Sequence, residues 1–327
     1  MSARLLCRLL TAPGEAVALD AVQWNAVIAI ARAELLIGSL AFRLRGLPVP
    51  APVAAILAAA ISSAEEGRRQ ALWEAEMARR ALATLGAPVI LLKGTAFAAA
   101  GLDAGQGRHI GDLDILVPRD ALAAAEAALL DAGWEWVKAD PYDDAYYRRW
   151  MHELPPLIHR ERDRMIDVHH TILPPTARST PDATQLIAAS VPLGAGLAML
   201  SPEDVVIHAA VHLFADGDLS GGLRNLWDID RLVREFTARD ADYPARLIAR
   251  AAAHQAGRTV ARALRLTAAL FDAAARRRML ARDDWGRGTQ PATRLAFYVR
   301  SHWLRMPPAM LARHLWIKMW RRSEHAG

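Results

Sequence analysis

A short block of strand patterns interrupts a sequence that is otherwise helical, and this block restricts the possible folds most strongly. Residues 89–92 form a continuous apolar run of strand length between Pro88 and Gly94, which is typical of a buried strand. An alternating run over 112–117 predicts a second strand, which Pro118 ends. Two strands this close together require a sheet within a helical protein.

The same block continues with alternating helix and strand patterns. Residues 95–101 predict a short helix, and the Ala-rich stretch 119–132 predicts a longer one. Further strands are expected at 134–137, 156–159 and 165–170. The sequence therefore predicts an α+β fold, in which helices surround a sheet.

Helical patterns flank this block on both sides. Apolar residues at intervals of three and four predict one helix over 20–44 and a second over 52–82. Downstream, residues 201–204 combine an N-cap serine, a proline and two acids, which marks a helix start, and 222–236 predicts another helix. We expect three regions: an N-terminal helical region (1–86), a core that contains the sheet (87–175) and a C-terminal helical lobe (176–327).

Composition excludes several classes of protein. The 327 residues are 53% hydrophobic with a formal net charge of only +5, which argues against a disordered chain and against a dedicated nucleic-acid coat. Cys7 is the only cysteine, so an internal disulfide framework and a thiolate metal cage are excluded. Arg4 and Arg8 interrupt the apolar N-terminus, and the most apolar stretch, 51–61, is too short to span a bilayer. We expect a cytoplasmic protein with no transmembrane segment.

Carboxylates on the predicted strands indicate a metal site. Asp112 and Asp114 share one face of their strand, and Asp167 shares a face with His169 on another. Like charges this close repel unless a cation lies between them, and Mg²⁺ is the natural cation for a few carboxylates and substrate phosphates. A third acid on a neighbouring strand would complete a two-metal site. In the alternative interpretation, Asp112 caps a loop, Asp114 pairs with an arginine and Asp167 lies on an edge.

A glycine turn precedes the paired acids. Leu92-Lys93-Gly94-Thr95 carries a strand into a helix and offers backbone N–H groups and a hydroxyl to phosphate oxygens. Lys93 either neutralises a γ-phosphate or lies at the outer side of a strand end.

Together, residues 91–117, with Leu-Lys-Gly-Thr, Arg108 and Gly-Asp-Leu-Asp, resemble the nucleotidyltransferase superfamily of the DNA polymerase beta type. The similarity extends to an uncharacterised bacterial branch with a Leu-Lys-Gly motif and an arginine shortly before Asp-x-Asp. It implies a minimal nucleotidyltransferase core with a mixed sheet. It also implies that Gly94 and Thr95 hold a triphosphate. The resemblance assigns two magnesium ions to Asp112, Asp114 and Asp167.

Two further segments belong to this interpretation. Arg108 either clamps a phosphate or pairs with Asp112. Residues 223–229 resemble the helix that closes over the nucleotide in these enzymes, with Arg224 and Asp228 on one face. Alternatively, Arg224 and Asp228 form an ordinary intrahelical salt bridge.

Two histidines and the C-terminal run offer weaker signals. His208 and His212 share a helix face, but Ala209 stands where a zinc protease has glutamate, so we expect a packed pair. The basic, Trp-rich run 303–322 either docks on its own protein or lies on RNA or an anionic membrane.

The resemblance predicts an enzyme that transfers a nucleoside monophosphate from an NTP to a hydroxyl with Mg²⁺, or with Mn²⁺ as the alternative ion. The acceptor is a small molecule, a peptide or protein, or RNA, of which RNA is not favoured. Two other functions stay open at this point. One is a degenerate nucleotide-binding scaffold that acts with a peptide-modification system, and the other is a glycosyltransferase that uses its Asp-x-Asp motif.

Overall fold

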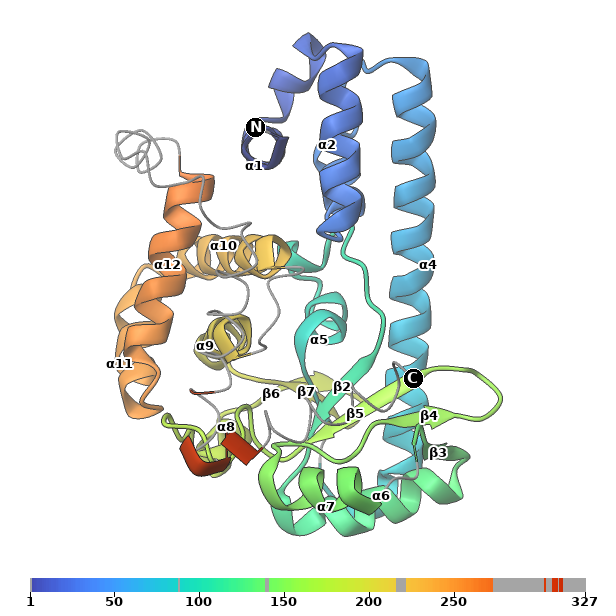
Figure 1. Ribbon diagram of the computed structural model, residues 1–327, viewed down its shortest axis with the longest axis vertical. Helices are drawn as coiled ribbons and strands as arrows, with labels where there is room; N and C mark the ends of the chain where they lie inside the picture. The colour runs from blue at the N-terminus through green and yellow to red at the C-terminus, as the bar shows by residue number, and fades with distance from the viewer. Residues whose placement is uncertain are drawn as a thin grey trace.

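The computed structural model describes residues 2–87, 89–138, 141–215 and 222–272, together with 303, 308–310 and 312–313. Within these residues helices surround a mixed sheet, which confirms the expected α+β class (Figure 1). The C-terminal run 303–322 lies largely outside the described residues.

The sheet of the described residues has seven strands in the order β3-β4-β5-β2-β1-β7-β6. The strands are β1 (Val89–Leu91), β2 (Leu113–Leu116), β3 (Trp134–Trp136), β4 (Leu157–His159), β5 (Met165–His169), β6 (Val191–Gly194) and β7 (Leu197–Met199). β2 runs parallel to β5, and β1 runs parallel to β7 but antiparallel to β2. The five strands expected from the sequence are all present, whereas the β6–β7 hairpin was not expected.

Burial explains why the central strands read as apolar runs. All residues of β1 and β2 are buried, because helices cover this part of the sheet. In Figure 1, α5 (Lys93–Ala99) and α9 (Pro202–Ala215) lie above the sheet, and α6 (Leu122–Asp131) and α7 (Pro141–Trp150) lie below it. The central strands therefore hold the side chains at their ends in fixed positions.

The N-terminal helices form a second hydrophobic core. They are α1 (Ser2–Thr11), α2 (Ala21–Ala33), α3 (Ile37–Arg43) and α4 (Ala51–Ala81). The expectation of one helix over 20–44 is wrong, because Leu35 adopts a left-handed backbone with φ 54° and separates α2 from α3. This turn folds α3 back, so that buried Leu36 and Leu40 reach the same core as Trp24.

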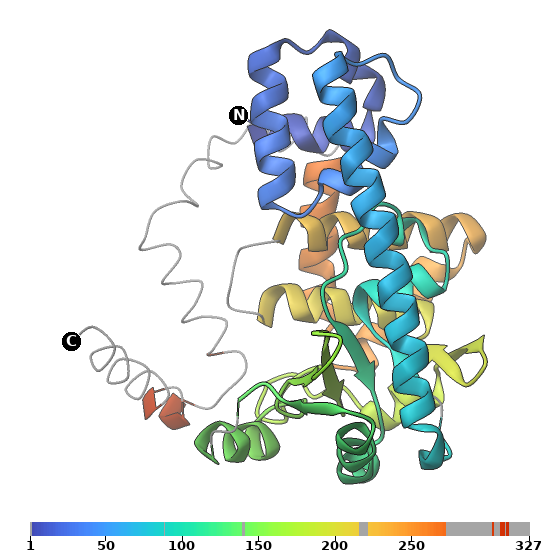
Figure 2. The same cartoon turned by 90° about the vertical axis from the view of Figure 1, so that its right-hand side faces the viewer.

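Helix α4 links the two ends of the molecule, and its observed bounds match the second helix expected from the sequence. It runs from the N-terminal helices down to the sheet, where it contacts α5, α6 and β2 (Figure 2). Trp227 and Phe271 of the C-terminal helices pack into the N-terminal core. The C-terminal helices therefore contribute to the N-terminal core, and α4 packs against both that core and the sheet region.

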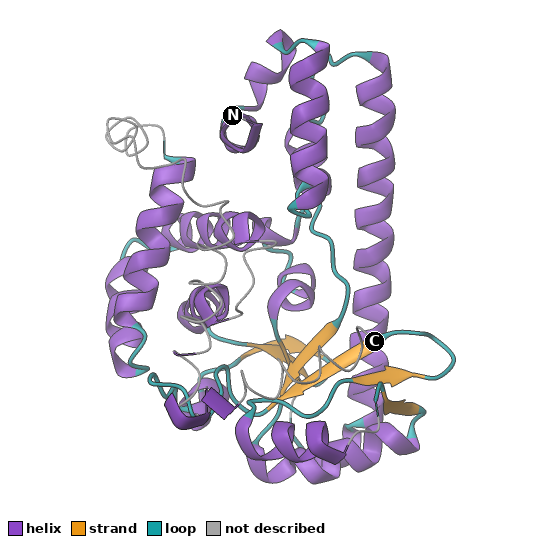
Figure 3. Cartoon of the chain, in the orientation of Figure 1, coloured by secondary structure: helices purple, strands orange, loops and turns teal. Residues whose placement is uncertain are grey.

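The remaining helices complete the C-terminal part (Figure 3). They are α8 (Ala183–Ala188), α10 (Gly222–Arg239), α11 (Tyr243–Ala253) and α12 (Gly257–Phe271). Short 3-10 turns lie at Pro13–Ala18, Ala83–Leu85, Asp103–Gly105 and Arg119–Ala121. Among the described residues, no helix has both the length and the apolar character needed to cross a membrane.

Candidate functional site

Three carboxylates converge at one edge of the central strands. Asp114 of β2 and Asp167 of β5 lie opposite each other in the parallel register, and Asp112 precedes β2 on the same face. Ligand oxygens of the three side chains all lie within 4.8 Å of one another. The structure therefore brings together the three acids that strand alternation singled out.

Two basic side chains hold Asp114 in place. Lys93 Nζ lies 2.6 Å from Asp114 Oδ1, and His169 Nε2 lies 3.0 Å from the same oxygen. Burial alone would raise the pKa of Asp114, but the charge of Lys93 and the hydrogen bond of His169 hold that pKa well below its usual value. The ion pair likewise raises the pKa of Lys93 despite its burial. Asp114 is therefore ionised.

Asp167 has the opposite electrostatic environment. Burial, followed by the negative charges of Asp114 and Glu153, raises the pKa of Asp167 to about 7. Its Oδ1 is buried and has no hydrogen-bond partner. This unsatisfied oxygen and the three clustered carboxylates fit a hard divalent cation such as Mg²⁺, which would relieve the repulsion and be bound by Asp112, Asp114 and Asp167.

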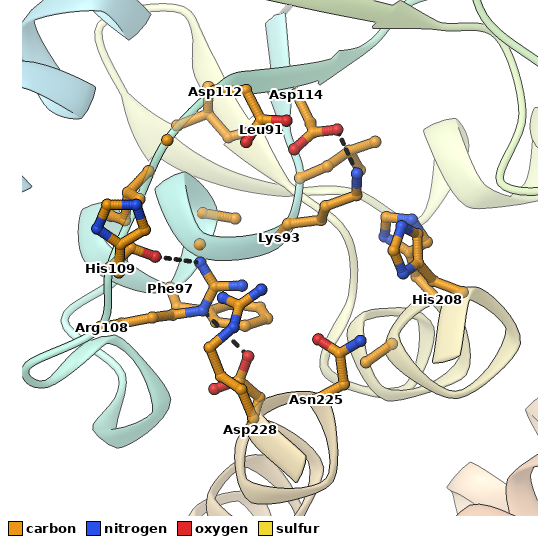
Figure 4. Close-up of a pocket in the computed structure, with 18 of the residues that line it drawn as sticks. Leu91, Lys93, Phe97, Arg108, His109, Asp112, Asp114, His208, Asn225 and Asp228 are labelled. Atoms are coloured by element: carbon orange, nitrogen blue, oxygen red, sulfur yellow. Dashed lines mark hydrogen bonds and ion pairs between the residues drawn. The ribbon is translucent and has the colours of Figure 1, made fainter. Parts of the chain in front are cut away.

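Asp112 and Asp114 face a cavity of about 650 Å³ (Figure 4). Asp112 and Asp114 lie on one wall, and residues of α9 and α10 lie across from them. The polar residues that line it are Lys93, Arg108, His109, Asp112, Asp114, Asp163, His208, His212, Arg224, Asn225 and Asp228. A cavity of this size with convergent charged groups is suited to a small charged ligand.

Arg108 forms a buried ion pair with Asp228. Its Nε lies 3.0 Å from Asp228 Oδ2, and its guanidinium lies over the Phe97 ring at 5.5 Å from the centroid. The expected pairing of Arg108 with Asp112 is therefore wrong, because α10 brings Asp228 to Arg108 from the other side of the cavity. Since Asp228 is engaged in this pair, the intrahelical alternative with Arg224 is also not observed.

Arg224 also lines the cavity, but its guanidinium differs from that of Arg108 in its hydrogen bonding. Its Nε is buried and has no hydrogen-bond partner among the described residues. Burial and then the charge of Arg108 lower the pKa of Arg224 from its usual value. A buried guanidinium nitrogen without an acceptor is costly, which points to an anionic ligand that the cavity would admit.

The glycine turn lies against the side chain of Arg108. A Cβ at Gly94 would lie 1.8 Å from Arg108 Nη1, so the missing side chain makes room for this guanidinium. Gly94 lines the cavity, whereas Thr95 is buried and its Oγ1 makes no hydrogen bond. Lys93 has a left-handed backbone with φ 47° at the first position of α5.

Sequence reasoning missed two residues beside the acids. His152 and Glu153 lie next to His169, and ligand atoms of these three residues fall within 4.8 Å of one another. Glu153 also forms an isolated antiparallel bridge with His169. No periodic pattern marks Met151-His152-Glu153, because this segment is outside the named strands.

The expected packed pair of His208 and His212 is present. Their rings meet edge-on with centroids 6.1 Å apart, and burial lowers the pKa of both. Both side chains are therefore neutral at pH 7.

Comparison with known families identifies the chain. Residues 20–272 match a family described as uncharacterised nucleotidyltransferase, which is more than half of the 327 residues. The chain therefore belongs to this nucleotidyltransferase family, which confirms the resemblance seen in the sequence. A search of curated proteins found no match.

Proposed function

We propose that the protein transfers a nucleoside monophosphate from an NTP to a hydroxyl acceptor in the presence of Mg²⁺. The observation that carries this proposal is the convergence of Asp112, Asp114 and Asp167 within 4.8 Å. The first two of these acids line the same cavity as Arg224. Oxygen ligands for a hard cation and a cationic partner for phosphate are the two requirements of phosphoryl chemistry.

The three carboxylates would hold the metal, whose positive charge would stabilise the transferring phosphate and the leaving pyrophosphate. Arg224 binds phosphate oxygens, which satisfies its buried Nε. Lys93 keeps Asp114 ionised. The Arg108–Asp228 pair links the loop before β2 to α10 and thereby positions Arg224 on the same helix. Most of the catalytic effect in this scheme comes from positioning and charge neutralisation.

The bond changes in this reaction balance without a further reactant. The acceptor oxygen forms a bond to the α-phosphorus, and the bond from that phosphorus to the bridging oxygen breaks, releasing pyrophosphate. The proton of the acceptor hydroxyl passes to a carboxylate, which we assign to Asp167 because its pKa is raised to about 7. The acceptor hydroxyl belongs to a small molecule, a peptide or protein, or RNA.

Label transfer tests the proposal. The purified protein is incubated with each α-labelled NTP, Mg²⁺ and fractions of a cell lysate, and both pyrophosphate release and labelled products are measured. We expect one or more NTPs to label an acceptor. The Asp112→Asn variant should lose at least about 100-fold in rate, because removing a charged group from a metal site costs several kcal/mol of transition-state stabilisation.

Asp120→Asn is the matched control, since Asp120 is an exposed aspartate outside the cavity. Equal rates for Asp112→Asn and Asp120→Asn would show that the carboxylate cluster takes no part in the reaction. If no NTP releases pyrophosphate in any fraction, the scaffold interpretation replaces this proposal. Transfer of a sugar from a nucleotide-sugar would instead support a glycosyltransferase.

A further inference from the structure

A second group of potential metal ligands lies beside the three acids. His169 Nδ1 is 3.3 Å from Glu153 Oε2, and His152 Nε2 is 3.7 Å from the same oxygen. His169 is almost fully buried, while the side chains of His152 and Glu153 are 15% and 17% exposed. The cluster is therefore held inside the protein but is reachable from solvent.

The hydrogen bonding of His169 leaves one of its nitrogens unsatisfied. Its Nε2 lies 3.0 Å from Asp114 Oδ1, and because the ionised carboxylate can only accept, Nε2 carries the proton. Nδ1 of the same ring faces the Glu153 carboxylate. Although the distance is short, Nδ1 makes no hydrogen bond. A buried imidazole nitrogen that lies 3.3 Å from a carboxylate oxygen and makes no hydrogen bond is available as a metal ligand.

The separations fit coordination of one transition-metal ion. Bonds of about 2.0–2.1 Å to zinc place the donor atoms of a tetrahedral site about 3.3 Å apart. The His169–Glu153 separation of 3.3 Å equals this value, and the His152–Glu153 separation of 3.7 Å is slightly longer. Two imidazoles and one carboxylate form a donor set used by zinc sites that keep a fourth position open.

We propose that His152, Glu153 and His169 form a Zn²⁺ site that is distinct from the carboxylate site. Imidazole nitrogen favours zinc, whereas Mg²⁺ prefers an all-oxygen environment such as the three acids. The hydrogen bond from His169 to Asp114 matches the outer-shell carboxylate that orients many zinc-bound histidines. Zinc at this position would tie the segment before β4 to β5 and fix His169 as a donor to Asp114.

The experiment measures zinc binding by the untagged full-length protein. Protein treated with a chelator is titrated with Zn²⁺ in excess Mg²⁺ against a chromophoric zinc indicator, and Co²⁺ is used in parallel for its visible absorption. We expect one equivalent of zinc and a tetrahedral or five-coordinate Co²⁺ spectrum. His152→Ala should weaken zinc binding by more than about 100-fold, since even loss of an outer-shell partner costs about 10- to 100-fold.

Three further variants make the result specific. His152→Cys should restore tight binding and add a thiolate absorption band with Co²⁺, because the thiolate is also a zinc ligand. This rescue separates a lost ligand from a damaged fold. His208→Ala and Asp112→Asn should bind zinc as the parent does, although each removes a candidate ligand nearby in the cavity.

Absence of stoichiometric zinc binding by the parent overturns the proposal, as does unchanged affinity in His152→Ala. Loss of zinc in His208→Ala would assign the ion to the His208–His212 pair instead. Loss in Asp112→Asn alone would assign it to the three acids. Retained zinc binding in Asp112→Asn also separates this proposal from the proposed nucleotidyl transfer, which that variant should slow by at least about 100-fold.

Discussion

Replacing Gly94 with alanine tests the close packing between α5 and the loop before β2. A Cβ at Gly94 would lie 1.8 Å from Arg108 Nη1 and 2.8 Å from its Cζ, so the guanidinium must leave its position. That movement breaks the buried ion pair with Asp228. Breaking such a pair costs about 3–5 kcal/mol, because a buried charge is left without its partner. We expect Gly94→Ala to lower the free energy of unfolding by about 3 kcal/mol or more.

Urea denaturation followed by circular dichroism measures this change. Gly257→Ala is the matched control, because Gly257 is also helical and nothing beyond the adjoining backbone lies within 4 Å of the position that its Cβ would take. It should change the free energy of unfolding by no more than about 1 kcal/mol, in the stabilising direction. In an Arg108→Ala background, Gly94→Ala should cost less than about 1 kcal/mol, since the clash is gone. A Gly94→Ala protein as stable as the parent would refute the reasoning.

Three other substitutions test separate parts of the account. Arg224→Ala should weaken NTP binding by about 10- to 100-fold in a fluorescence titration without lowering the melting temperature, because its buried Nε has no hydrogen bond to lose; a clearly lower melting temperature would make Arg224 structural. Burial lowers the pKa of His208 to about 3, so the folded state excludes a proton and stability falls as pH decreases below the unfolded value of about 6.5. Between pH 7 and pH 5.5 the parent should therefore lose on the order of 1 kcal/mol of stability through His208, and His208→Gln should lose that much less in urea titrations. An unchanged pH dependence in the variant would contradict this. Gln255 is exposed and has a left-handed φ of 55° after α11, a conformation that is strained for glutamine but not for glycine. Gln255→Gly should therefore raise the free energy of unfolding by about 1 kcal/mol. A loss of stability would show that the backbone at Gln255 is not strained.

Local patterns were sufficient to predict the central strands and the acids on them. Alternation placed Asp112 and Asp114 on one face, and burial on both sides made β1 a continuous apolar run. The β6–β7 hairpin escaped prediction because Pro192 and Gly194 disrupt its strand pattern. The break between α2 and α3 also escaped it, since Leu35 carries no sequence signal for a left-handed backbone.

The parts of the site that depend on distant contacts could not be predicted. Arg108 pairs with Asp228, which is 120 residues away, and only the packing of α10 over the cavity decides this partner. The motif also did not indicate that the Arg108 guanidinium lies against Gly94, while the assignment of Gly94 to the triphosphate stays a prediction. His152 and Glu153 reach the site through an isolated bridge, and no local periodicity marks them.

The most direct test of the central claim is the binding of a non-hydrolysable NTP analogue with and without Mg²⁺. Calorimetry on the parent should give saturable binding that requires Mg²⁺, because the three carboxylates would bind the phosphates only through a cation. Asp112→Asn should lose about tenfold or more in affinity, while Asp120→Asn should bind as the parent does. Binding that is independent of Mg²⁺, or equal in both variants, would contradict the assignment of Asp112, Asp114 and Asp167 as the metal-binding acids.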